Sequence, residues 1–215
     1  FGYDLLDFTE YDINGKNLSE AAIKSIIKQI VKKLNMIHSI GISHGDLCLE
    51  NVCAKYENNQ YIVRLIDFGF AIIHPRSPLY NLFKDKNHVV YATVISTVDN
   101  SFDIMNCVIN IKNKLYGRIG SISPERHKAT YGDTTYDAYK DDIFAIGTIM
   151  FVLFTNMLFI NEYVDVDEHY YKIEKKTWVS ILQHHCPNIS PNAIDLMEKI
   201  ITFEKNRITL NEILA

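Results

Sequence analysis

The sequence has few cysteines, and none of them is paired at a spacing that suggests a disulfide or metal framework. The 4 cysteines among the 215 residues include no C-x-x-C pair and are scattered at Cys48, Cys53, Cys107 and Cys186. Disulfide scaffolds are built from regularly spaced cysteines in small secreted domains, and zinc sites from closely spaced pairs. We therefore expect reduced thiols and an intracellular, cytoplasmic location.

The sequence also lacks a block of basic residues and a secretion signal. The formal net charge is -4 and the isoelectric point is about 6.1. Nucleic-acid-binding domains are commonly basic on one face, so we expect no nucleic-acid partner. No charged amino-terminal region is followed by an apolar segment of the signal-peptide type. With 47% hydrophobic and 22% charged residues, the composition is typical of a globular domain.

One long stretch, residues 143–160, is almost entirely apolar. About 18 uncharged residues are enough to span a bilayer, and a helix that is apolar on all sides is buried either in lipid or in protein. Asp141 and Asp142 precede the stretch, Asn156 interrupts it, and no basic flank sets an orientation. These features favour a helix buried in protein, and we expect no membrane partner.

The clearest amphipathic pattern occupies residues 23–37. Isoleucine and leucine recur there every three or four positions, and lysines lie between them, as in a helix with one buried face. Asn17 or Ser19 can cap its beginning, and Gly41 suits the position after its last turn.

Weaker patterns predict the remaining elements. Residues 52–54 and 61–66 are typical of two short strands joined by a turn. Further helices are predicted near residues 177–184 and after Ser190 and Thr209, which are good capping residues. These patterns describe a mainly α chain with a few short strands.

The residues with the most chemical potential lie between the first helix and these strands. Asp46 and Asn51 are five positions apart in the segment His44 to Asn51, and Asp67 follows the second strand. One acid can accept a hydroxyl proton, while the amide and the second acid can hold magnesium, which suits phosphoryl transfer. Without Asp67, Asp46 could equally be a turn residue and Asn51 a helix cap.

These motifs resemble those of the eukaryotic-type protein kinases. His44 to Asn51 and Asp67-Phe68-Gly69 are similar to the family's H-R-D-L-x-x-x-N and D-F-G motifs. Ser123-Pro124-Glu125 stands where the family has A-P-E, and residues 142–147 resemble its D-x-W-x-x-G motif. Arg207 matches the arginine that pairs with the acid of A-P-E. The resemblance implies a mainly α, kinase-like carboxyl-terminal lobe with a few short strands around the catalytic loop.

The resemblance also implies roles for single residues. Asp46 would be the catalytic base, and Asn51 and Asp67 the magnesium ligands. Asp142 would anchor the catalytic loop to a buried helix, and Glu125 would form an ion pair with Arg207. At the cofactor site, the resemblance implies Asp4 at the ribose and Cys53 under the adenine, together with Asn51 and Asp67. Glu50 is also implied there, although it could instead meet basic substrate residues. The implied cofactors are ATP and Mg²⁺, and the implied substrate is Ser or Thr of a protein.

The sequence departs from the family pattern at several positions. Gly45 replaces the arginine that normally pairs with an activation-loop phosphate, so we expect no such contact. Cys48 replaces the lysine of the catalytic loop, and Arg118, where many members have threonine, is a candidate for supplying the missing charge. The segment between Gly69 and Glu125 is long, which predicts an insertion at about residues 75–110.

Several family motifs are missing from residues 1–215. The sequence contains no Gly-rich loop, no lysine of the V-A-I-K type and no helix-C acid, which cover and clamp the ATP phosphates. We therefore interpret residues 1–215 as a fragment that starts near the hinge. Its partner would be the small lobe of the same chain, and the fragment alone is expected to be inactive.

Two other functions remain open from the sequence. The departures at Gly45 and Cys48 suggest a pseudokinase or scaffold domain. A small-molecule kinase of the aminoglycoside or choline type is the other alternative, because His-Gly-Asp is common in that group. Those enzymes lack the Pro-Glu motif and its arginine partner, which stand here at Glu125 and Arg207.

Overall fold

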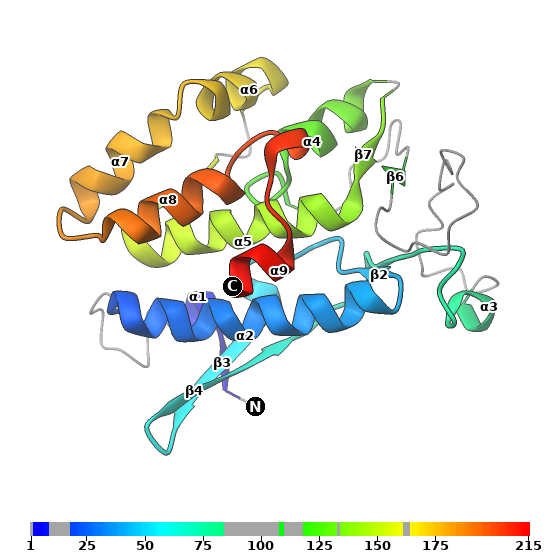
Figure 1. The fold of residues 1–215 in the computed structure, drawn as a ribbon, viewed down its shortest axis with the longest axis horizontal. Helices are drawn as coiled ribbons and strands as arrows, with labels where there is room; N and C mark the ends of the chain where they lie inside the picture. Colours follow the sequence, from blue (N-terminus) through cyan, green and yellow to red (C-terminus); the bar gives the residue numbers. More distant parts are fainter. Residues whose placement is uncertain (1, 9–17, 84–107, 110–117, 133, 161–163) are drawn as a thin grey trace.

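Helix α5 (Ala138–Thr155) lies at the centre of the fold (Figure 1). Helix α2 (Glu20–Ser39) contacts it on one side, and α7 (Thr177–His185) and α8 (Pro191–Ile200) contact it on the other. The computed structural model describes residues 2–8, 18–83, 108–109, 118–132, 134–160 and 164–215. The helical elements also include α1 (Leu5–Asp7), α3 (Tyr80–Phe83), α4 (Pro124–Tyr131), α6 (Val166–Glu174), α9 (Leu210–Leu214) and the 3-10 helices η2 (Leu49–Asn51) and η3 (Glu204–Asn206).

The burial of α5 confirms the prediction of a helix enclosed by protein. Of its 18 residues, all but Lys140 and Val152 are buried. The helix begins earlier than predicted, because Asp137 caps the amides of Tyr139 and Lys140. It ends at Thr155, where Asn156 adopts a left-handed conformation with a φ of 56°. Within the described ranges, no helix combines the length and the hydrophobicity needed to cross a bilayer.

Helix α2 also follows its predicted pattern. Ser19 caps it by accepting a hydrogen bond from the Ala22 amide at 3.2 Å, and Gly41 follows its last turn with a φ of 78°. The predicted stripe is buried from Ile23 to Leu34. The lysines lie off this stripe, so one apolar face of α2 is free to pack against α5.

Within the described part of the chain, the strands form three small antiparallel sheets. Strands β1 (Tyr3–Asp4), β3 (Val52–Glu57) and β4 (Gln60–Leu65) make one sheet, in the order β1-β3-β4. Strand β2 (Ile42–Ser43) pairs with β5 (Ile72–Ile73), and β6 (Val108–Ile109) pairs with β7 (Tyr136–Asp137). The β3–β4 turn has positive φ angles at Asn58 and Asn59 (52° and 60°), the geometry of a tight hairpin turn that asparagine tolerates.

The free edge of β4 is partly covered by a side chain from α2. The Gln29 amide nitrogen donates to the Tyr61 carbonyl at 2.8 Å, and its oxygen accepts from the Val63 amide at 3.1 Å. This carboxamide therefore satisfies two backbone groups as a neighbouring strand would. It fixes the hairpin against α2 and so fixes the strand ends that lead into the candidate site.

Other expectations were incomplete. The segment around residues 161–176 reads as a loop in sequence, but Asp165 caps the helix α6 there, and Ser123 caps α4. Residues 88–98 are rich in β-branched residues, a pattern typical of a strand, but they lie outside the described residues. Most of the expected insertion at residues 75–110 does so as well.

The packing of α6 against α4 generates a prediction about stability. His169 is 0% exposed, and its Nδ1 lies 3.3 Å from Nδ1 of His127. Burial, with the charges of His127 and Lys172, lowers the pKa of His169 to about 3. Because an unfolded histidine titrates near pH 6.5, the folded protein loses stability as the pH falls below that value.

We expect the free energy of unfolding to fall by up to about 2 kcal/mol more in the wild type than in His169→Gln between pH 7 and pH 5. Chemical denaturation of both proteins at the two pH values measures this difference. Equal pH dependence in the two proteins would contradict the neutral, buried state of His169.

Candidate functional site

The segment that carries Asp46 is held between two regular elements. It leaves strand β2 at Ser43 and enters η2 at Leu49. Strand β2 is paired with β5, so that Ser43 lies opposite Ile72. Asp46 therefore lies in a short loop whose two ends are both fixed by backbone hydrogen bonds.

The loop is also anchored from α5 by Asp142. One oxygen of this carboxylate accepts from the His44 amide at 2.7 Å and the other from the Gly45 amide at 3.0 Å. The His38 ring, at the end of α2, lies 2.8 Å from the first oxygen. Burial alone would raise the pKa of Asp142, but the hydrogen bonds and charges around it lower the pKa below its usual range. Asp142 therefore stays ionised and joins α2, α5 and the loop.

Asp46 and Asn51 are in direct contact. The Asn51 amide nitrogen donates to the Asp46 carbonyl at 2.7 Å and to Oδ2 of its carboxylate at 3.0 Å. The other carboxylate oxygen, Oδ1, is buried with no hydrogen-bond partner among the described residues. Burial raises the pKa of Asp46, although the charge of Arg126 and the Asn51 hydrogen bond oppose the rise. This carboxylate therefore has one oxygen that is oriented by Asn51 and one whose hydrogen-bonding capacity is unused among the described residues.

Asp67 lies beside Asn51 because of the hairpin register. Val52 pairs with Leu65, and the Ile66 amide donates to the Asn51 carbonyl at 2.9 Å. Asp67 has a φ of 57°, which is uncommon for a residue with a side chain and is seen at functional turns. Its Oδ1 accepts from the Gly69 amide at 3.0 Å.

Phe68 contacts the loop that carries Asp46. Its ring lies 4.7 Å from the ring of His44, between centroids, and Nε2 of His44 lies 3.0 Å from the Ile66 carbonyl oxygen. The segment on either side of Asp67 is therefore packed against the catalytic-loop candidate. This packing holds the residues on both sides of Asp67 against the loop that carries Asp46.

The donor set fits a magnesium ion bound together with phosphate oxygens. Because the Asn51 nitrogen is used by Asp46, its side-chain oxygen is the atom left for a ligand, and Asp67 has a second carboxylate oxygen. Mg²⁺ prefers oxygen ligands and is usually held by one or two protein groups, water and phosphate. Among the described residues, no three His, Cys, Asp or Glu side chains are grouped as an all-protein metal site.

Asp4 and Cys53 face each other across the β1–β3 pair. Asp4 Oδ1 accepts from the Asp7 amide at 2.9 Å and caps the short helix α1. Burial raises the pKa of the Cys53 thiol, and the nearby Asp4 charge adds to the effect. The structure thus pairs Asp4 on β1 with Cys53 on β3, the strand that continues from Asn51.

Glu50 pairs with Arg118 at the edge of the same loop. A cavity of about 140 Å³ lies beside this pair. Its floor is mainly apolar and includes Leu49, Ile149 and Phe159. Cys48 is buried, and burial raises the pKa of its thiol to about 12, so it carries no charge.

Glu125, in the first turn of α4, pairs with Arg207, which directly follows η3. Arg207 Nη2 is 3.1 Å from the Glu125 carboxylate, and the guanidinium is 4.9 Å from the Phe144 ring centroid. Arg207 also donates to the carbonyls of Lys140 (2.8 Å) and Ile200 (3.2 Å). The pair therefore joins α4, α5 and the segment after α8.

The sequence interpretation did not identify three residues that support the site: Arg126, Asp141 and His38. Arg126 and Asp141 form an ion pair at 2.7 Å, with 2% and 5% of their side chains exposed. His38 binds Asp142 and stacks on Tyr139 with 4.4 Å between ring centroids. The sequence carried only a weak signal for the ion pair: Arg126 is a charged residue directly after Glu125, and Asp141 is a second acid directly before Asp142.

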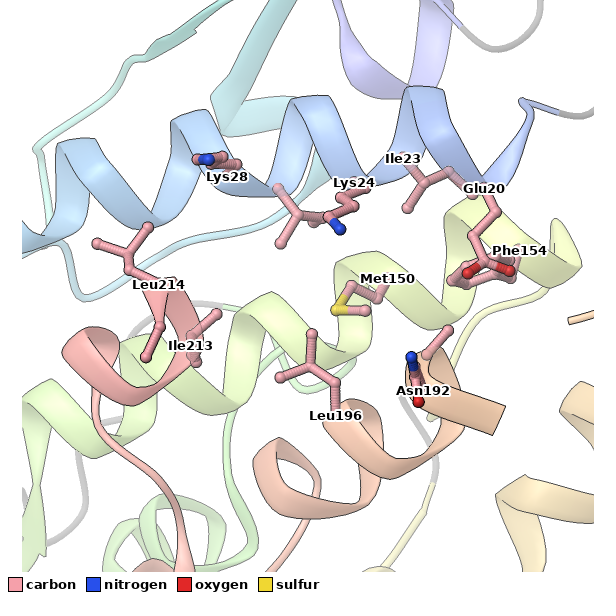
Figure 2. A pocket seen from close by; sticks show the side chains of 13 residues that line it. Glu20, Ile23, Lys24, Lys28, Met150, Phe154, Asn192, Leu196, Ile213 and Leu214 are labelled. Atoms are coloured by element: carbon pink, nitrogen blue, oxygen red, sulfur yellow. The ribbon is translucent and has the colours of Figure 1, made fainter. Parts of the chain in front are cut away.

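A larger cavity of about 360 Å³ lies elsewhere, between α2, α5, α8 and α9 (Figure 2). Its lining includes Ile23, Met150, Leu196 and Leu214. None of the sequence-predicted site residues lines it. This larger cavity therefore lies apart from the catalytic-loop candidate.

Comparisons with known proteins agree with this geometry. The family model described as "Protein kinase domain" matches residues 3–215. The probable serine/threonine-protein kinase nek3 of Dictyostelium discoideum is 27% identical over 209 residues, 97% of this chain and 15% of that protein. Calcium-dependent protein kinase 33 of Arabidopsis thaliana is 24% identical over 204 residues, 91% of this chain and 30% of that protein. The chain thus spans less than a third of the length of these relatives.

A solved structure shares the fold. The crystal structure of the Rad53 kinase domain and SCD2 matches with a TM-score of 0.64 and 20% identity, over 99% of this chain and 60% of that chain. At this identity the likeness concerns the fold, which is that of a helical kinase-like lobe.

The contact between Glu125 and Arg207 generates a prediction about stability. Arg207→Met leaves the half-buried Glu125 carboxylate without its cation, and breaking a buried pair in this way costs about 3–5 kcal/mol. We expect a loss of this order in the free energy of unfolding, measured by chemical denaturation. Lys199→Met, which removes an exposed pair with Asp195, is the control and should change the value by less than about 1 kcal/mol. Similar effects of the two substitutions would contradict a structural role for the Arg207 pair.

Proposed function

The chain belongs to the protein kinase domain family, and from that premise we propose that residues 1–215 form the large lobe of a serine/threonine protein kinase. In the intact protein, the γ-phosphoryl group of ATP would be transferred to a Ser or Thr hydroxyl of a protein substrate. The observation that supports this most directly is the Asp46–Asn51 contact at 3.0 Å, which leaves Oδ1 of Asp46 without a hydrogen-bond partner among the described residues.

The reaction can be written in terms of these residues. The substrate hydroxyl oxygen attacks the γ-phosphorus, its proton passes to Asp46, and the bond to the β–γ bridging oxygen breaks, so that ADP leaves. The Asn51 hydrogen bond keeps one oxygen of Asp46 in place while the other faces the hydroxyl. Asn51 and Asp67 would hold Mg²⁺, which when bound neutralises charge on the phosphate oxygens.

The nucleotide would extend along β3. Asp4 and Cys53 are opposite each other on β1 and β3, in line with the chain that leaves Asn51. We propose that Cys53 lies under the adenine and that Asp4 binds the ribose. Because no Gly-rich loop and no lysine of the V-A-I-K type is present in residues 1–215, the parts that clamp the phosphates would come from the small lobe.

Arg118 would supply a cation close to the transferred group. Its positive charge is near enough to Asp46 to lower the pKa of that carboxyl against the larger effect of burial. Cys48, in contrast, is neutral and buried. The apolar cavity beside Glu50 and Arg118 would receive a substrate side chain next to the acceptor hydroxyl.

The role of Asp46 as the catalytic base can be tested by substitution. In the full-length protein, Asp46→Asn should lower kcat by about 10²–10⁴-fold, because the hydroxyl proton loses its acceptor. Asp195→Asn, an exposed aspartate on α8, is the matched control and should keep the wild-type rate. Transfer of labelled phosphate from ATP in the presence of magnesium, followed by identification of the phosphorylated residue, measures both rate and Ser/Thr preference.

The same assay separates the alternatives. A wild-type protein without magnesium-dependent transfer would support a scaffold domain instead. Transfer to aminoglycosides or choline but not to protein would support a small-molecule kinase. Normal turnover by residues 1–215 alone would contradict the need for the small lobe.

The role of Arg118 can be tested in the same way. Arg118→Ala should lower kcat by about 10²-fold, because one electrostatic group near the developing charge is lost. Arg118→Lys keeps the charge and should retain a larger part of the rate. Equal rates in the wild type and Arg118→Ala would show that Arg118 only pairs with Glu50.

A further inference from the structure

Arg126 reaches from α4 into the loop that carries Asp46. Its Nη1 donates to the Gly45 carbonyl at 2.7 Å and to Oδ2 of Asp141 at 2.7 Å. The other oxygen of Asp141 accepts from the Ser123 amide at 2.7 Å. A single buried guanidinium thus connects the start of α4, the start of α5 and the peptide group directly before Asp46.

That peptide group belongs to a residue that tolerates no side chain. Gly45 has a φ of 77°, and a Cβ atom placed on it would lie 2.1 Å from the Phe70 carbonyl oxygen. The backbone after Asp67 therefore passes directly against Gly45. An arginine cannot occupy position 45 in this arrangement. The positive charge that contacts the Gly45 carbonyl comes instead from Arg126 on α4.

The Gly45 residue is held from both sides. Its amide donates to Asp142 at 3.0 Å, and its carbonyl accepts from Arg126. Because the Gly45 carbonyl and the Asp46 amide share one planar peptide group, fixing the carbonyl also fixes the amide nitrogen and the Cα atom of Asp46, from which its side chain leaves the backbone. Asp142 and Arg126 together hold the two sides of Gly45 in place.

We propose that Arg126 is a positioning residue for the phosphoryl transfer, which holds the peptide before Asp46 and couples the catalytic loop to the start of α4 through a buried internal contact. The proposal rests on the proposed kinase function. The loop is then ordered by Arg126 and by the close approach of Phe70 to Gly45, and it needs no phosphate group on the segment that follows Asp67.

A purely structural ion pair would behave differently. Breaking such a pair lowers stability, but the remaining folded molecules would keep their kcat. Loss of a positioning contact lowers kcat in the folded protein, because small displacements of a catalytic group can cost about 10²-fold in rate. The Michaelis constants should change little, since Arg126 is buried and contacts neither ligand.

The test uses the full-length protein with Arg126→Met/Asp141→Asn. This double variant leaves no unpaired buried charge, and the asparagine oxygen can still accept from the Ser123 amide. We expect cooperative unfolding close to that of the wild type, KM values for ATP and protein substrate within about twofold, and a kcat lower by about 10–100-fold. Lys128→Met, an exposed cation on the same helix, should leave kcat unchanged.

Arg126→Lys provides the second arm. It keeps a charged donor in the same place, so its kcat should lie below that of the wild type and, where the double variant folds, above that of the double variant. Wild-type kcat in Arg126→Lys, together with wild-type kcat in the double variant where that variant folds, would overturn the proposal while leaving the kinase function intact. An inactive wild type would overturn the kinase function itself, and this proposal with it.

Discussion

The arrangement of the site depends on one buried carboxylate. Asp142 is 1% exposed, and it is stable there because its two oxygens accept from the His44 and Gly45 amides and face the His38 ring. A buried charge needs such partners to offset its lost hydration. The loop that carries Asp46 is therefore attached to the most buried helix, and the rigidity of that helix is transmitted to it.

The first turns of α5 serve several parts of the fold at once. Lys140 donates from its Nζ to the Arg207 carbonyl, Asp141 binds Arg126, and Asp142 holds the loop. Consecutive residues on a helix point about 100° apart, so three neighbours reach three directions. The polar start of α5 thereby orders the surrounding segments, while its apolar remainder packs into the core.

Local signals in the sequence were sufficient for much of the fold. The caps at Ser19, Ser190 and Thr209 and the uncharged run of α5 each depend on a few neighbouring residues, and the structure has all of them. Helix α6 was missed because its apolar positions are few and lie among charged and tyrosine residues. The contacts of Arg126 with Gly45 and Asp141 span 81 and 15 residues, and no local pattern reports such distances.

The departures from the family motifs have a different meaning in the structure than in the sequence. Position by position, Gly45 and Cys48 look like two lost cations. In space, the charges of Arg126 and Arg118 both act on Asp46 and oppose the rise of its pKa that burial causes. Since an electrostatic effect depends on distance and not on the element from which a charge comes, a loop that lacks its usual cations can still have a positive environment. Judging such a site from its motif alone would underestimate the positive charge that acts on Asp46.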